Sequence, residues 1–129
     1  MTVVYLDSSA VVKLVVRESE SAALRRFLAG RATRASCGLA RTEVRRAVAQ
    51  SGEKTRERAR RVIATLDLIQ LDDALLDGAG DLHGDLRSLD AIHVAAAQSL
   101  GPDLECVVTY DRRMAAAVTA AGLAAAAPS

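Results

Sequence analysis

Short runs of apolar residues without polar alternation recur along the chain, and longer segments that carry charged residues separate them. Such uninterrupted runs are typical of strands that are buried on both faces of a parallel sheet. The pattern predicts strands at residues 2–6, 35–38, 68–71 and 105–109, and a weak edge strand in the tail at 123–127.

The segments between these runs are predicted to be helices, because they begin at residues that cap helices and end at or near glycine. The expected N-caps are Ser8 or Ser9, Ser19, Ser88 and Asp111. A further helix is predicted with Asp72 and Asp73 in its first turn, and glycines at 78, 80 and 84 are expected to make the chain after it less regular. Caps included, the other helices are predicted at 8–16, 19–28, 39–51, 54–66, 88–100 and 111–121.

Strands that alternate with helices of about ten residues indicate an open parallel sheet, covered by helices on both sides and joined by right-handed crossovers. The length of 129 residues and the hydrophobic content of 50% suffice for one buried core, so we expect a single domain over residues 1–129. In such sheets, ligands gather beyond the carboxyl ends of the strands. A functional site is therefore expected at that edge.

Composition argues against two classes of function. Aromatic residues make up 2% of the chain and tryptophan is absent, which disfavours recognition of nucleic-acid bases by aromatic stacking. No apolar run is long enough to cross a membrane, and the opening sequence MTVVYLD lacks the basic region and cleavage site of a signal peptide. We therefore expect no membrane partner and a cytoplasmic location.

The net charge of +1 hides a strong asymmetry along the chain. Residues 1–66 carry 14 Lys and Arg against 6 Asp and Glu, whereas residues 67–129 carry 3 against 10. This segregation favours a polyanionic partner such as a nucleic acid. Charges on solvated helix faces of a fold that mixes both halves would give the same totals.

Four acidic residues stand where an apolar run gives way to a helix, or one turn inside a helix: Asp7, Glu43, Asp90 and Asp111. Carboxylates that share one cleft repel one another unless protons or a divalent cation neutralise them. Mg²⁺ prefers oxygen ligands and keeps several waters, which leaves room for a phosphate group. The arrangement predicts a metal site, whereas each acid taken alone could be a helix cap or a partner of the helix dipole.

Four separated segments carry a resemblance to a known family: YLDSSAVVKLVV, RTEVRRA, LRSLDAIHVAAA and VVTYDRRMAAAVTAAGL. In this order and at this chain length they resemble the PIN-domain ribonucleases, and more narrowly the VapC toxins. The resemblance implies a three-layer α/β/α sandwich with a central parallel sheet of four to five strands. It also implies cleavage of RNA that depends on Mg²⁺ or Mn²⁺. The acidic set of the family maps onto the four acids above, and its small hydroxyl residue maps onto Ser9.

We expect Asp7 and Asp90 to be the principal metal ligands, directly or through water. Glu43 and Asp111 would complete the cluster or orient the attacking water, and one or two ions could act. The resemblance further implies a homodimer and a VapB antitoxin, with which the toxin would form a hetero-oligomer. A segment of that antitoxin would wrap the toxin and obstruct its acidic site. The RNA target, a tRNA or another structured RNA, is not readable from one sequence.

Further residues could support such a site. Ser9 and Thr109 are close enough to Asp7 and Asp111 to hydrogen-bond a carboxylate or a phosphate, or they could simply be capping and strand hydroxyls. One guanidinium group can donate two parallel hydrogen bonds to the oxygens of a phosphate, so arginines near the acids are candidate RNA contacts. These are Arg112 and Arg113 after the last acid, and Arg41, Arg45 and Arg46 on the helix of Glu43. A solvated helix face or an antitoxin-binding surface is the alternative.

His93 lies three residues after Asp90, on the same helical face, but Mg²⁺ prefers oxygen to imidazole, so we expect a structural neighbour. His83 is expected to be exposed. Cys37 and Cys106 are predicted to be reduced, buried thiols. The strand order implied by the resemblance places the first strand between them, and two strand spacings exceed the reach of a disulfide.

Three rival functions remain for comparison. A phospho-receiver domain would need a lysine after its fifth strand, and Lys13 and Lys54 are the only lysines. A phosphatase with an aspartyl nucleophile would need a second aspartate two residues after the first, where this chain has Ser9. A catalytically silent RNA-binding or protein-interaction module of the same fold would keep the basic helices but would not need four acids.

Overall fold

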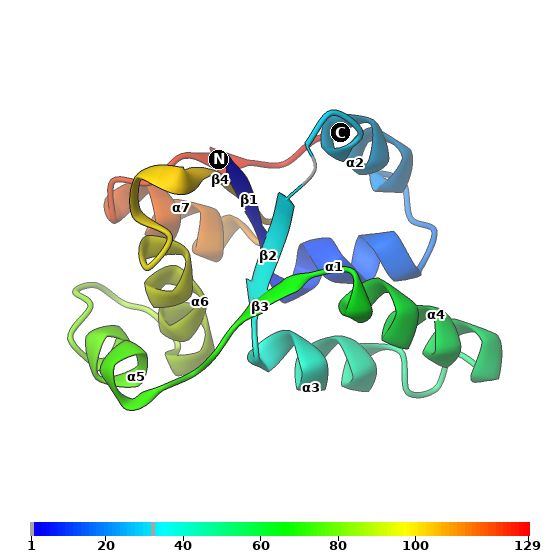
Figure 1. The fold of residues 1–129 in the computed structure, drawn as a ribbon, viewed down its shortest axis with the longest axis horizontal. Helices are drawn as coiled ribbons and strands as arrows, with labels where there is room; N and C mark the ends of the chain where they lie inside the picture. Colours follow the sequence, from blue (N-terminus) through cyan, green and yellow to red (C-terminus); the bar gives the residue numbers. More distant parts are fainter. Residues whose placement is uncertain (1, 32) are drawn as a thin grey trace.

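The computed structural model describes residues 2–31 and 33–129 as a parallel sheet between two layers of helices (Figure 1). The strands lie in the order β3-β2-β1-β4-β5, and every neighbouring pair is parallel. Their bounds are Val3–Leu6 for β1, Thr33–Cys37 for β2, Asp67–Ile69 for β3, Leu104–Val108 for β4 and Ala125–Ala126 for β5. The predicted α/β/α sandwich with five parallel strands is confirmed.

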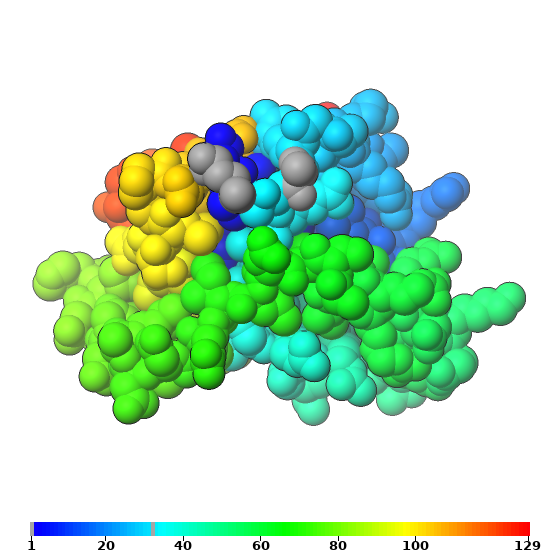
Figure 2. Space-filling view, in the orientation of Figure 1, coloured from blue at the N-terminus to red at the C-terminus, as the bar shows by residue number. Residues whose placement is uncertain are grey.

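Helices α1 to α4 cover one face of the sheet, and α5 to α7 cover the other (Figure 1). The first group comprises Ser8–Val15 (α1), Ser21–Leu28 (α2), Leu39–Ala47 (α3) and Glu53–Ala64 (α4). The second comprises Asp73–Gly80 (α5), Ser88–Gln98 (α6) and Arg112–Ala120 (α7), with a short 3₁₀ helix, η1, at Gly101–Asp103. In the space-filling view, the green segment from α4 through β3 to α5 crosses one face of the molecule as a band (Figure 2).

Strand β1 is buried on both faces because it lies between the two helical layers. Val4 and Leu6 pack into the core on the side of α1 to α4, whereas Val3 and Tyr5 pack into the core on the side of α6 and α7. Side chains that alternate in this way put every residue of the strand in an apolar layer, which is why the run lacks polar alternation. No helix in the described parts of the chain is long and apolar enough to span a membrane.

Several predicted helix boundaries are wrong. Asp7 caps α1, instead of Ser8 or Ser9, since its carboxylate accepts a hydrogen bond from Ala10 N at 3.0 Å. Glu20 and Arg87 occupy the N-cap positions of α2 and α6 without a side-chain cap, so Ser19 and Ser88 do not act as predicted. Asp111 caps α7 as expected. At α1 the carboxylate of Asp7, directly after β1, is a stronger acceptor for the first free N–H groups of the helix than a serine hydroxyl.

Two helices have lengths that differ from the prediction. Helix α3 ends at Ala47, because Val48 leaves the helical conformation and is buried in the core. Helix α5 includes Gly78 and Gly80, which were expected to lie in looser chain. The predicted strand order is confirmed, and Cys37 and Cys106 are both free and buried, on either side of β1.

Candidate functional site

The four predicted acids line one cavity of about 350 Å³ beyond the carboxyl ends of the central strands. Asp7 follows β1 directly, and Asp111 lies three residues after the end of β4. Asp90 is in the first turn of α6 and Glu43 is in the middle of α3. The remaining lining residues are Ser8, Ser9, Arg87, Ser88, Leu89 and His93. Four segments far apart in the sequence thus contribute to one acidic cavity.

Asp7 is the most buried of these acids, with 5% of its surface exposed. One carboxylate oxygen accepts hydrogen bonds from Ser9 Oγ at 2.6 Å and from Ala10 N, and the other accepts a short bond from the Thr109 hydroxyl. Burial raises the pKa of Asp7, and these hydrogen bonds offset only part of the rise. The carboxylate is therefore fixed in orientation and incompletely solvated, a state that a nearby cation would relieve.

The hydroxyls predicted to support the site both hold Asp7. Ser9 Oγ also accepts a hydrogen bond from Tyr110 N at 3.1 Å, and Thr109 Oγ1 accepts one from Asp111 N at 3.1 Å. Thr109 thus connects the end of β4 to the acid that follows β1, instead of binding the Asp111 carboxylate. These contacts fix the relative positions of the two strand ends that carry the acids.

Glu43 is held by two donors at a single oxygen. Ser8 Oγ donates to Glu43 Oε1 at 2.6 Å, and His93 Nε2 lies 2.8 Å from the same atom. Although burial raises the pKa of Glu43, the hydrogen bonds from His93 and Ser8 outweigh burial and lower it. Glu43 is thus kept ionised, and no hydrogen bond to its Oε2 occurs within the described residues.

His93 joins Glu43 to the core of the sheet. It is 3% exposed, and its Nδ1 lies 2.7 Å from the Tyr5 hydroxyl and 3.7 Å from Cys37 Sγ. Burial lowers the pKa of His93, but hydrogen bonds and charge from Cys37 and Glu43 outweigh burial and raise the pKa to about 10. In the protonated imidazole both ring nitrogens donate, to Glu43 and to Tyr5, so the ring is a rigid support for the carboxylate.

Arg87 bridges the other two acids. Its Nε lies 3.2 Å from Asp90 Oδ2, and its Nη2 lies 3.3 Å from Asp111 Oδ2. The second oxygen of Asp111 accepts the cap bonds from Arg113 N and Met114 N. The guanidinium is therefore a cation that neutralises two carboxylates of the cavity from within the same chain.

The donor set suits a hard divalent cation, since carboxylate oxygens are the ligands that Mg²⁺ and Mn²⁺ prefer. Among residues 2–31 and 33–129, however, no three His, Cys, Asp or Glu side chains converge on one point. Asp90 and Asp111 each pair with the guanidinium of Arg87. The residues fit a metal if this exposed side chain moves aside.

Removing the Arg87 side chain tests that competition. We expect Arg87→Ala to bind Mn²⁺ more tightly, on the order of five-fold, because two solvent-screened ion pairs no longer compete for the carboxylates. Isothermal titration calorimetry measures this effect without any substrate. Arg112→Ala is the control, since it removes the same charge next to Asp111 without breaking an ion pair to either acid. Equal changes in both variants would indicate a general charge effect and no competition.

The arginines predicted from the sequence lie outside the acidic cavity. Arg112 and Arg113 are exposed at the start of α7, and Arg113 lines a different cavity beside α6. Arg41, Arg45 and Arg46 line a cleft of about 410 Å³ between α3 and α4, which we call the α3–α4 cleft. Arg56 and Arg60 complete its basic lining, and Val48 and Ala59 contribute apolar surface.

Sequence reasoning missed two residues of the site. Ser8 is predicted only as a helix cap, and the sequence does not single out Arg87, although both adjoin an acidic motif. His93 is predicted as a structural neighbour from its spacing to Asp90 on one face of the helix. The structure agrees with that interpretation and adds that its ring hydrogen-bonds Glu43.

Comparison with known proteins agrees with this geometry. A family model, the PIN domain, matches residues 4–119. The chain is 54% identical over its full length to the whole of Ribonuclease VapC46 of Mycobacterium tuberculosis (strain ATCC 25618 / H37Rv). It is 36% identical to Ribonuclease VapC47 and 37% identical to Ribonuclease VapC35 of the strain CDC 1551 / Oshkosh, with 97% of this chain and 96% of each relative covered. The chain therefore belongs to the PIN-domain family and, within it, to the VapC ribonucleases.

Proposed function

We propose that this protein is a metal-dependent endoribonuclease and the toxin of a type II toxin–antitoxin module. The observation that carries the proposal is that four carboxylates from four segments line one cavity at the edge of the sheet. A relative that is 54% identical over the full chain bears the name ribonuclease. Three donors hold Asp7 and two hold Glu43, which gives the preorganised geometry that catalysis requires.

Asp7 and Asp90 are the proposed principal ligands of Mg²⁺ or Mn²⁺, and Glu43 and Asp111 contribute directly or through water. One or two bound ions would supply polarisation of the scissile phosphate and acidification of water. Ser9 and Thr109 keep the Asp7 carboxylate in one orientation. Both donors to Glu43 use Oε1, so Oε2 is the atom that can accept a hydrogen bond from the attacking water.

The partners follow from the family. We propose that a VapB-type antitoxin binds the toxin, that the toxin forms a homodimer and a toxin–antitoxin hetero-oligomer, and that the protein is cytoplasmic. The substrate is RNA, in our proposal a tRNA or another structured RNA. The support for an RNA partner in this chain is the excess of arginine and lysine in residues 1–66.

Incubation of the purified protein with total cellular RNA tests the activity. We expect discrete cuts in Mg²⁺ or Mn²⁺ and none after chelation with EDTA, and sequencing of the new ends would identify the RNA and the cut site. The antitoxin must be removed first, because it would obstruct the acidic cavity. If the folded, metal-loaded protein binds RNA but leaves every RNA intact, the chain is instead the catalytically silent module.

A further inference from the structure

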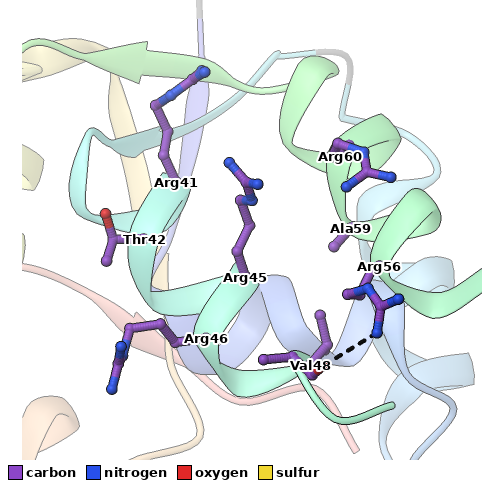
Figure 3. A pocket seen from close by; sticks show the side chains of 9 residues that line it. Arg41, Thr42, Arg45, Arg46, Val48, Arg56, Ala59 and Arg60 are labelled. Atoms are coloured by element: carbon purple, nitrogen blue, oxygen red, sulfur yellow. Dashed lines mark hydrogen bonds between the residues drawn. The ribbon is translucent and has the colours of Figure 1, made fainter. Parts of the chain in front are cut away.

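The α3–α4 cleft gathers five arginines with no acidic residue in its lining. Arg41 and Arg45 extend from the same side of α3, and Arg56 and Arg60 come from α4 across the cleft, whereas Arg46 points away from α4 (Figure 3). Val48 and Ala59, both buried, form the apolar part of the lining. The cleft is therefore a concave surface lined mainly by positively charged side chains, with a small apolar part.

The arginines of α3 are not neutralised by the fold. Arg41, Arg45 and Arg46 are exposed, and none of them forms an ion pair or donates a side-chain hydrogen bond within residues 2–31 and 33–129. Arg41 and Arg45 are four residues apart on one helix, where like charges repel. Arg45 lies in the last turn of α3, where the helix dipole favours a cation, but no acidic side chain of the described residues pairs with either guanidinium, so both are free to bind an anionic ligand.

The arginines of α4 are held in place. Arg56 donates to Glu53 at 2.6 Å and to the Ala49 carbonyl at 3.2 Å, a contact that joins the two sides of the cleft (Figure 3). Arg60 donates to Glu57 at 2.7 Å and to Glu53 at 3.1 Å. Two positioned guanidiniums therefore face two unpaired ones, an arrangement that suits a group with several anionic oxygens.

The cleft and the acidic cavity share helix α3. Glu43 faces the acidic cavity, and Arg41 and Arg45, two residues to either side, lie roughly 200° around the helix from it. Four carboxylates in one cavity repel a phosphate chain, so a polyanionic substrate needs a positive site outside the cavity. A helix is roughly 10 Å wide, and only a chain that continues beyond the cut site could reach both places.

We propose that the α3–α4 cleft binds the phosphodiester backbone of the RNA substrate away from the cut site. This inference rests on the proposed function and deepens it. Arg41 and Arg45 would bind phosphate oxygens as the primary contacts, and Arg56 and Arg60 would complete the site from α4. Because these contacts reach phosphates and no base edges, the site adds affinity that depends on RNA length and salt but not on sequence.

The test combines Arg41→Ala and Arg45→Ala in one variant. Its matched control combines Arg17→Ala and Arg26→Ala, two exposed arginines outside the cleft that form no ion pair in the described chain. Binding of a fluorescent single-stranded RNA is measured by anisotropy on an Asp7→Asn background, so that the RNA stays intact. We expect the cleft variant to bind the RNA about ten-fold more weakly than the protein with an intact cleft. The slope of the logarithm of the binding constant against the logarithm of the salt concentration should become less negative by about 1.4, or about 0.7 for each lost phosphate contact. The control should change less in both measurements.

Cleavage kinetics with Asp7 restored separate this proposal from the proposed function. We expect the KM for a long RNA to rise more in the cleft variant than the KM for a tetranucleotide. If the wild type cuts RNA but the cleft variant and the control behave alike, the cleft proposal fails while the function stands. If polyglutamate binds through Arg41 and Arg45 and RNA does not, the cleft serves an acidic protein and the proposal is wrong. If the wild type cuts no RNA, the proposed function itself fails.

Discussion

Asp7→Asn is expected to reduce RNA cleavage by at least about 100-fold, more than the 10- to 100-fold loss that is typical when only a neighbour of a metal ligand is changed. The substitution keeps the size of the side chain and its acceptor for Ala10 N, but it removes the negative charge of the most buried of the four acids. Initial rates on an RNA cut by the wild type measure the loss. Asp77→Asn, an exposed acid of α5, is the control for charge.

The same variant should remain folded. Burial raises the pKa of Asp7, which means that the charged form is disfavoured in the folded protein, and asparagine does not carry that penalty. The lost acceptor for the Thr109 hydroxyl acts in the opposite direction, so we expect the free energy of unfolding to change by less than about 1.5 kcal/mol. Thermal unfolding checks this expectation. An unfolded variant would contradict this expectation, and a folded variant with nearly full activity would contradict the assignment of Asp7 as a metal ligand.

The free energy of unfolding of the wild type is expected to fall as the pH rises from about 6.5 toward 10, and the origin of the fall is His93. The folded protein holds the pKa of His93 at about 10, above the 6.5 of the unfolded chain. Between these values the unfolded state has lost a proton that the folded state still binds, so stability decreases by up to about 1.4 kcal/mol for each pH unit. The contribution is complete below pH 6.5 and is lost above the folded pKa.

Urea unfolding at several pH values in EDTA measures this effect, with His93→Gln as the comparison. The variant is expected to have a lower free energy of unfolding at pH 6.5 and a smaller decline than the wild type. Burial raises the pKa of the Cys106 thiol, which leaves a residual decline in both proteins. Burial raises the pKa of Tyr5 well above 10, so the series should end below pH 9.5, before tyrosine ionises in the unfolded chain. The same pH series on a Cys37→Ser background separates the contribution of His93 from that of the Cys37 thiol, which lies near Nδ1 of the ring. Parallel curves for the wild type and His93→Gln would show that the histidine is not charged at neutral pH.

The elements that could be predicted from the sequence are those with a simple hydrophobic pattern or a local rule. Strand β1 reads as a buried parallel strand because all of its residues are apolar, and Asp111 reads as a cap because it directly precedes an apolar helix. The position of Glu43 in the site followed only from its helix and from the family resemblance. Its convergence with Asp7 and Asp90 depends on how distant segments pack, which periodicity does not encode.

The parts that could not be predicted depend on competition between side chains in space. Arg87 faces Asp111 across 24 positions of the chain, and His93 faces Glu43 across 50. No local spacing rule relates residues so far apart. The predictions of Ser8 and Ser9 as caps failed for a similar reason, because the neighbouring carboxylate of Asp7 is the stronger acceptor, and the Ser9 hydroxyl donates to that carboxylate.

The edges of the sheet restrict how copies of this protein can assemble. The outer strands β3 and β5 are three and two residues long, so each exposes a short row of unpaired backbone groups. A second chain that extended the sheet would form few hydrogen bonds, because these edge strands are short. The same shortness disfavours edge-to-edge growth into fibrils. Short edge strands therefore favour pairing of two copies through side chains outside the sheet, where substitutions can alter pairing without altering the sheet.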